Sequence, residues 1–148
     1  MNHELEVSLQ FIKEFEGCHT YDRKTGLYRP YYCPAGVLTI GWGATGSGIT
    51  FSSRWTKAQC DERLKKDVYQ CMVAVKKLLP NATGGLLVAC TSFAYNVGIN
   101  ALKNSTLRRK VLRGDLQGAK KEFLKWKFAG GRELKGLLRR RQAEADLF

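Results

Sequence analysis

The residue whose type and place best suit chemistry is a glutamate at the end of the first predicted helix, residues 4–16. The apolar stripe of this helix runs through Leu5, Leu9 and Ile12, and its next step falls on Glu16. A carboxyl group therefore takes a core-facing position in the last helical turn, where the helix dipole disfavours negative charge. Desolvation and the dipole both favour the protonated carboxyl, the form that a general acid needs near neutral pH. The alternative is a structural glutamate that turns to solvent or pairs with an arginine.

A glycine-flanked segment and a cysteine are the next candidates. In Thr39-Ile40-Gly41-Trp42-Gly43, two glycines flank an aromatic residue, and this pattern lets a backbone approach a ligand closely, although a glycine in a small sheet can equally mark a bulge. Cys33 stands six residues before Thr39 and is expected to face it across a tight hairpin. On its own, Cys33 has the ordinary interpretation of a small buried apolar group.

The elements that must position these residues follow from periodicity and turn residues. Residues 18–50 have no helical period and contain turn and β-forming residues, which predicts a small sheet. Thr56 opens a long helix that runs to about Leu79, and it begins with a T-x-x-Q capping-box pattern. Four more helices are predicted: one after Gly84-Gly85 through Val97, one from 105 to about 112, one opened by Gly114-Asp115 and one over 134–147. The order of one helix, a small sheet and many helices predicts an α+β fold.

Composition limits the class of protein. The 148 residues carry a net charge of +12, and most of the excess lies in residues 101–148, which hold 14 basic and five acidic side chains. A basic face implies an anionic partner, either nucleic acid or another anionic polymer, and no zinc-finger or RNA-binding signature favours nucleic acid. Five cysteines at irregular spacing and two histidines predict free thiols and no metal site. No apolar stretch is long enough to span a bilayer, and the N-terminus does not resemble a secretory signal.

The motifs, taken in order, resemble those of phage lysozymes (endolysins) of glycoside hydrolase family 24, and most closely the lambdoid branch. The resemblance rests on Glu16-Gly17, Tyr31-Tyr32-Cys33, Thr39-Ile40-Gly41-Trp42-Gly43, Ser92-Phe93-Ala94-Tyr95-Asn96-Val97-Gly98, Asn104-Ser105-Thr106-Leu107 and Gly136-Leu137-Leu138-Arg139-Arg140-Arg141. It covers nearly the whole chain.

The resemblance implies a lysozyme-like α+β fold in a single domain, residues 1–148. A small β-rich lobe (about 17–55) would be joined by a long connecting helix (about 56–80) to a mainly helical lobe (about 83–148), which packs with helix 4–16. The active-site cleft would lie between the lobes.

The resemblance also implies the chemistry. Glu16 would be the general acid, Thr39 would position the attacking water, and Cys33 would assist that water at a position where some relatives have aspartate. Three further residues would bind the substrate, namely Tyr95, Asn96 and Gly98. Arg140 would pair with Glu16 and fix its orientation, although Arg139 to Arg141 could instead form a solvated helix face. No cofactor or metal is implied.

The implied activity is hydrolysis of the β-1,4 linkage between N-acetylmuramic acid and N-acetylglucosamine in bacterial peptidoglycan during host lysis. The partners would be the glycan strands. We expect a monomer with holin-dependent release, no nucleic-acid partner and no stable membrane insertion. The enzyme would stay in the host cytoplasm until release and then act on the cell wall. Two alternatives remain, a lytic transglycosylase and a non-catalytic basic module that binds the wall.

The chain departs from the family pattern at two places. Sixteen residues separate Glu16 from Cys33, which is more than the family usually has, so we expect an enlarged loop within residues 18–30, near the mouth of the cleft. This segment contains Asp22, which is a less suitable second acid because no T-I-G-x-G motif follows it. The second departure is Ala44, where many relatives have a histidine.

Overall fold

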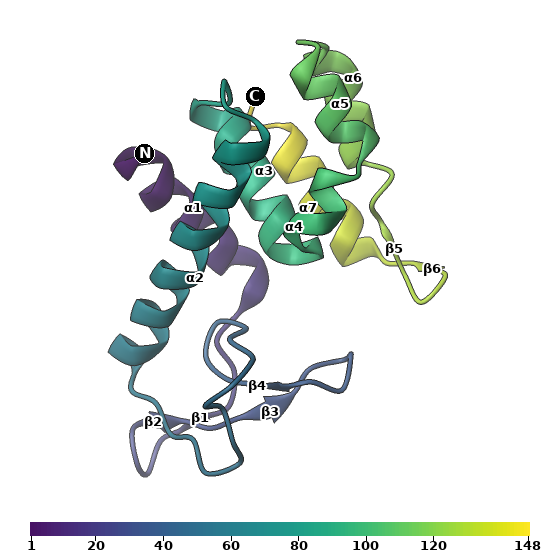
Figure 1. Cartoon of the computed structure of the whole chain (residues 1–148). Helices are drawn as coiled ribbons and strands as arrows, with labels where there is room; N and C mark the ends of the chain where they lie inside the picture. Colours follow the sequence, from purple (N-terminus) through teal and green to yellow (C-terminus); the bar gives the residue numbers. More distant parts are fainter. The chain divides into compact units, whose positions relative to one another are not determined.

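The computed structural model describes residues 1–148, and it consists mainly of helices with three short antiparallel strand pairs (Figure 1). The predicted α+β class is confirmed. The chain divides into two compact units, one comprising residues 9–67 and the other comprising residues 1–8 together with 68–148. Helices α1 (Asn2–Glu16) and α2 (Lys57–Leu78) both contain a boundary between the units, so each helix contributes to both.

The unit of residues 9–67 holds two β-hairpins. Strand β1 (Tyr21–Asp22) pairs with β2 (Leu27–Tyr28), and β3 (Tyr31–Tyr32) pairs with β4 (Leu38–Thr39). The segment predicted as an enlarged loop is therefore an ordered hairpin, and Tyr28 joins it to Trp55 by an isolated bridge. Asp22 is the last residue of β1, and its carboxylate accepts a hydrogen bond from the Lys24 N–H in the turn at 2.9 Å.

A small apolar core supports these hairpins. Ile40, Ala44 and Ile49 are buried together, and Leu38 and Trp55 pack against them. Ala44 stands where many relatives have a histidine, and its small apolar side chain fits this core. The fixed position of Ile40 matters for the candidate site because it directly follows Thr39 in the chain.

Helix α2 begins with the predicted capping box. The Gln59 N–H donates to the Thr56 hydroxyl at 3.1 Å, and the Thr56 N–H donates to the Gln59 side chain at 2.8 Å. These two bonds satisfy backbone donors that a helix start leaves open, which explains why the helix begins at Lys57.

The other unit is a helical bundle formed by α3 (Gly84–Val97), α4 (Ile99–Lys103), α5 (Thr106–Leu112), α6 (Leu116–Phe123) and α7 (Lys135–Ala145). Helix α3 contacts α4 and α7, and α6 contacts α5 and α7. The structure confirms the predicted helices apart from small shifts of their ends. It adds the five-residue α4 and the hairpin of β5 (Phe128–Ala129) and β6 (Arg132–Glu133), which the sequence patterns did not predict.

A buried ionic cluster ties α7 to α3. Glu144 is fully buried, accepts a hydrogen bond from the Ser92 hydroxyl at 2.6 Å, and lies 2.6 Å from the Arg141 Nε. Arg140 is also buried, and its Nε lies 3.5 Å from the same carboxylate. The alternative of a solvated arginine face is therefore wrong for Arg140 and Arg141. No helix in the structure has both the length and the apolar character that crossing a membrane would require.

Candidate active site

Glu16 is the last residue of α1, and the residue after it explains why the helix ends there. Gly17 has φ 62°, a left-handed conformation that other residues rarely adopt. A Cβ atom at this position would lie 3.0 Å from the imidazole ring of His19, so a side chain would also be crowded. The local sequence therefore fixes Glu16 at the helix terminus, where its side chain is half-buried.

The β3–β4 hairpin contains both Cys33 and Thr39. Tyr31 stands opposite Thr39 in the strand register. The turn is closed by the Cys33 N–H, which donates to the Val37 carbonyl at 3.0 Å, and by the Gly36 N–H, which donates to the Cys33 carbonyl at 2.8 Å. The register pairs Thr39 with Tyr31 and leaves Cys33 opposite Val37, so Cys33 does not face Thr39 directly, although Thr39 contributes to lowering the pKa of the Cys33 thiol.

The surroundings of Cys33 favour its thiolate. The backbone N–H of Val37 gives the largest effect, and the Ala35 N–H and the Thr39 hydroxyl add to it, so the pKa of the Cys33 thiol is lowered despite some desolvation. A thiolate can accept a proton or stabilise positive charge, which a thiol does poorly. The turn therefore gives this cysteine acid–base character.

Thr39 is buried, and its hydroxyl is held in place. Its Oγ1 donates to the Val37 carbonyl at 2.8 Å, and the hydroxyl also helps to lower the pKa of the Cys33 thiol. A hydroxyl has one proton and two lone pairs. Whichever neighbour takes the proton, a lone pair remains to accept a hydrogen bond from a water molecule.

Tyr31 connects Glu16 with the hairpin, and sequence reasoning assigned it no role. Desolvation raises the pKa of its phenol, and the nearby charges of Glu16, Cys18 and Cys33 raise it further. Glu16 and Cys33 therefore lie near enough to Tyr31 for their charges to act on it, and Tyr31 is also the strand partner of Thr39. The ring is fixed by an edge-to-face contact with His19 at 5.5 Å.

A charged cluster around Trp42 anchors the segment that follows Thr39. The Trp42 indole N–H donates to Asp61 at 2.7 Å, and Lys57 lies over the indole ring at 4.0 Å. Asp61 also pairs with Lys13 of α1 at 3.2 Å. Gly41 fits closely here, because a Cβ at this position would lie 3.0 Å from the Cys60 sulfur. Asp61 thus links α1, α2 and the glycine-flanked segment, a role that the sequence did not reveal.

The remaining predicted site residues lie in the helical unit. Tyr95 and Asn96 are in the last turn of α3, and the Asn96 side-chain oxygen accepts a hydrogen bond from Arg141 at 2.9 Å. Gly98 caps α3, and its N–H donates to the Ala94 carbonyl at 2.8 Å.

Arg140 donates to the Ser92 carbonyl and hydroxyl, each at 3.2 Å. The pairing of Arg140 with Glu16 and the substrate-binding roles stay predictions.

The thiol environments predict selective alkylation. Burial raises the pKa of Cys60, Cys71 and Cys90 to about 12, and desolvation also raises that of Cys18. Only the thiolate reacts, so iodoacetamide near neutral pH should modify Cys33 before the other four. Because the Cys33 pKa is lowered, this order should become sharper as the pH falls below 8.5, the usual thiol value.

Peptide mapping by mass spectrometry after short exposure measures the order. Cys18 is the internal comparison, because it is half-exposed like Cys33 but has a raised pKa. Equal rates for Cys18 and Cys33 would show that exposure controls reactivity and that the turn does not activate Cys33.

Comparison with known proteins places this architecture in the lysozyme-like class. The muramidase domain of SpmX from Asticaccaulis excentricus superimposes with a TM-score of 0.80 at 28% identity, covering 96% of this chain and 94% of that chain. Residues 13–144 match the phage lysozyme family model. The chain therefore belongs to the phage lysozyme family, as its motifs indicated.

Two curated relatives agree with this placement. The SAR-endolysin of Bacteriophage PS119 is 40% identical over 124 residues, which cover 81% of this chain and 72% of the relative. The endolysin of Bacillus phage B103 is 38% identical over 144 residues, or 97% of this chain, but the match spans only 52% of that longer protein.

Proposed function

We propose that the chain is a phage endolysin that hydrolyses the β-1,4 linkage between N-acetylmuramic acid and N-acetylglucosamine in bacterial peptidoglycan. Family membership supports a peptidoglycan-lytic enzyme of phage lysis, a glycoside hydrolase of the lysozyme type. One observation supports hydrolysis of this glycosidic linkage. The Glu16 carboxyl and the Cys33 thiol, whose pKa is lowered, both act on Tyr31, and the hydrogen-bonded Thr39 hydroxyl belongs to the same hairpin.

In this proposal, Glu16 protonates the leaving oxygen of the linkage while water adds to the anomeric carbon and the glycosidic bond breaks. Thr39 accepts a hydrogen bond from that water and so orients it. The Cys33 thiolate takes the proton that the water loses, and its position matches the aspartate of some relatives. After the products leave, Glu16 regains a proton and Cys33 releases one to solvent, which restores the starting state.

We assign the sugar contacts to α3. The Asn96 oxygen already accepts from Arg141, so its amide N–H groups are the part suited to a substrate carbonyl. The Gly98 N–H is used within the helix cap, and the Gly98 carbonyl accepts from the Leu102 N–H at 3.4 Å, so its second lone pair is the part suited to an N-acetyl N–H. Tyr95 would contact the sugar with its ring or its hydroxyl. Arg140 would orient the Glu16 carboxyl.

Product analysis tests hydrolysis directly. Purified sacculi are digested in heavy-oxygen water, and the fragments are examined by mass spectrometry. A hydrolase places one heavy oxygen at each new reducing end, whereas a lytic transglycosylase yields anhydro products that lack one water and carry no label. Unlabelled anhydro products would refute the proposal, and intact sacculi would favour the non-catalytic wall-binding module.

Substitution of Cys33 measures its share in catalysis. Cys33→Asp restores a carboxylate at this position and should retain substantial hydrolysis. Cys33→Ala should slow hydrolysis, although less than the 10²–10⁴-fold or so expected for loss of a general acid, because Thr39 still holds the water. If Cys33→Ala digests sacculi as fast as the unchanged enzyme, Cys33 has only a packing role.

We also propose storage in the host cytoplasm, holin-dependent release and action at the cell wall as a monomer. Fractionation of expressing cells with and without a co-expressed holin tests the release step. Enzyme outside the cytoplasm in the absence of the holin would contradict it.

A further inference from the structure

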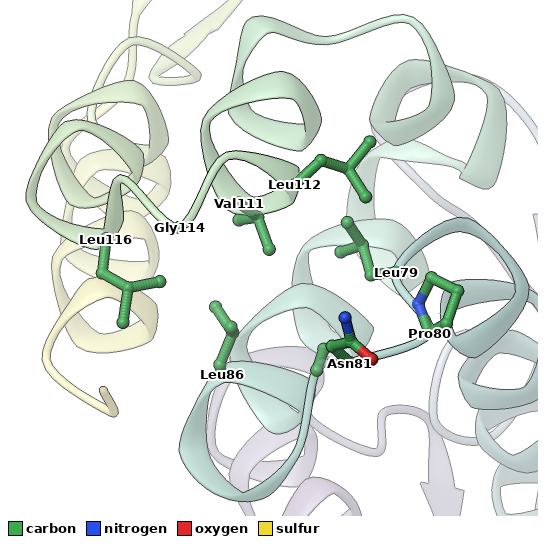
Figure 2. Close-up of a pocket in the computed structure, with 9 residues that line it drawn as sticks. Leu79, Pro80, Asn81, Leu86, Val111, Leu112, Gly114 and Leu116 are labelled. Carbon is green, nitrogen blue, oxygen red and sulfur yellow. The ribbon is translucent and has the colours of Figure 1, made fainter.

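The helical unit contains an apolar pocket that the proposed mechanism does not use. It has a volume of about 260 Å³ and lies where the end of α2, the start of α3, the end of α5 and the start of α6 meet (Figure 2). Leu79, Leu86 and Val111 point into it, and Asn81 supplies the only polar side chain in its wall. The pocket is smaller than the roughly 300–1,000 Å³ of typical small-molecule sites.

The turn between α5 and α6 carries two leucines that belong both to the pocket wall and to the exposed surface. Leu112 is 55% exposed and Leu116 is 40% exposed. The turn is well defined, since the Gly114 N–H donates to the Val111 carbonyl at 3.0 Å and Asp115 caps α6 through the Gly118 N–H at 2.9 Å. A hydrogen-bonded turn thus presents two large aliphatic side chains to solvent.

Positive charge borders this apolar surface. Residues 103–121 hold seven lysines and arginines and a single acid, Asp115, which pairs with Lys110 at 3.5 Å. Arg109 and Arg113 are exposed on either side of Leu112 in the sequence. At the pocket wall, the Lys76 ammonium donates to the Ala82 carbonyl at 2.8 Å. A ligand for this surface must therefore combine aliphatic groups with negative charge.

The lining distinguishes between anionic partners. Bases of single-stranded nucleic acids stack on aromatic side chains, and the pocket wall contains none. Exposed aliphatic side chains beside lysine and arginine are typical of surfaces that lie in the headgroup region of anionic bilayers. We propose that the α5–α6 surface binds peripherally to an anionic phospholipid bilayer, with Leu112 and Leu116 at the boundary between headgroups and acyl chains and Arg109 and Arg113 on the phosphates. This role is independent of the proposed catalytic residues.

Vesicle co-sedimentation of the full chain tests the proposal. Vesicles of phosphatidylglycerol with phosphatidylethanolamine should bind the protein, and vesicles of phosphatidylcholine alone should bind it much more weakly. Arg109→Gln/Arg113→Gln should weaken binding about 30-fold at low salt, taking ~1 kcal/mol for each basic residue near the surface. Leu112→Ser/Leu116→Ser should weaken binding at least about ten-fold, because the inserted apolar area is lost.

Matched controls separate this surface from general charge and hydrophobicity. Lys65→Gln/Lys66→Gln removes two exposed charges from α2, and Phe128→Ser removes an aromatic residue that is 57% exposed. Both controls should bind vesicles like the unchanged chain, and every variant should digest lipid-free sacculi at the unchanged rate. Equal binding to both vesicle types, or full binding by either α5–α6 variant, would overturn the proposal. The proposal would also be overturned if the α5–α6 variants kept full binding to vesicles and lost only their binding to sacculi or to a DNA oligonucleotide.

Discussion

Replacing Glu16 with glutamine is expected to reduce the hydrolysis of purified sacculi by about 10²–10⁴-fold while the protein remains folded. The amide keeps the size and shape of the side chain but carries no proton that it can donate to the leaving oxygen. Glu16 lies at the end of α1 and its side chain is half-buried, so the substitution removes an acid and leaves the helix and its Gly17 terminus intact. The measurement is the release of reducing ends, together with thermal unfolding followed by circular dichroism.

Glu14→Gln is the matched control, because Glu14 lies on the same helix two residues earlier and is exposed. It makes the same chemical change away from the hairpin and should keep full activity. More than about 1% residual activity in Glu16→Gln would contradict its role as general acid, given the usual size of that contribution.

The second large effect concerns stability. Glu144→Ala is expected to destabilise the protein by about 3–5 kcal/mol, the usual cost of removing one partner from a buried ion pair. The fully buried carboxylate is shared by Ser92, Arg140 and Arg141, with contacts at 2.6 Å to the Ser92 hydroxyl and to the Arg141 Nε. Without Glu144, the guanidiniums of Arg140 and Arg141 would still bear the cost of desolvation, but the negative charge that offsets this cost would be gone.

Urea denaturation at constant pH measures this change, and Glu133→Ala is its control. Glu133 pairs with Lys127 at 3.5 Å, but the Glu133 side chain is 50% exposed, so the expected loss is only about 0–1 kcal/mol. If both variants lost a similar amount of unfolding free energy, burial would not strengthen the ion pairs of Glu144. The stability loss of Glu144→Gln should lie between those of Glu144→Ala and Glu133→Ala, because glutamine keeps the packing and one hydrogen-bond acceptor.

The sequence by itself predicted six of the helices, and their ends differ only slightly in the structure. Apolar stripes and caps are local signals, and they act over three or four residues. Thr56 with Gln59, Ser105 before α5 and Asp115 before α6 all make the cap contacts that their residue types predict. The same local logic placed Glu16 at the end of α1 and a turn between Cys33 and Thr39, whereas the catalytic roles proposed for these three residues came from the resemblance to the family.

Elements too short to show a repeating hydrophobic pattern were not predicted from the sequence. Helix α4 has five residues, and the strands of the β5–β6 hairpin have two each, so neither repeats a pattern often enough to be recognised. The segment before Pro30 was expected to form an enlarged loop because it is longer than in the family, and it is the β1–β2 hairpin, which agrees with the small sheet predicted for residues 18–50.

Only the tertiary structure decided which distant side chains meet. The Trp42 bond to Asp61 joins residues 19 apart, and the Ser92 bond to Glu144 joins residues 52 apart. It also brought Tyr31 within reach of the charges of Glu16 and Cys33, and it buried Arg140 and Arg141 on a helix whose sequence looks solvent-exposed. Local patterns carry no information on such contacts, because a charged side chain becomes part of a core only when folding supplies an opposite charge and hydrogen bonds that offset its desolvation.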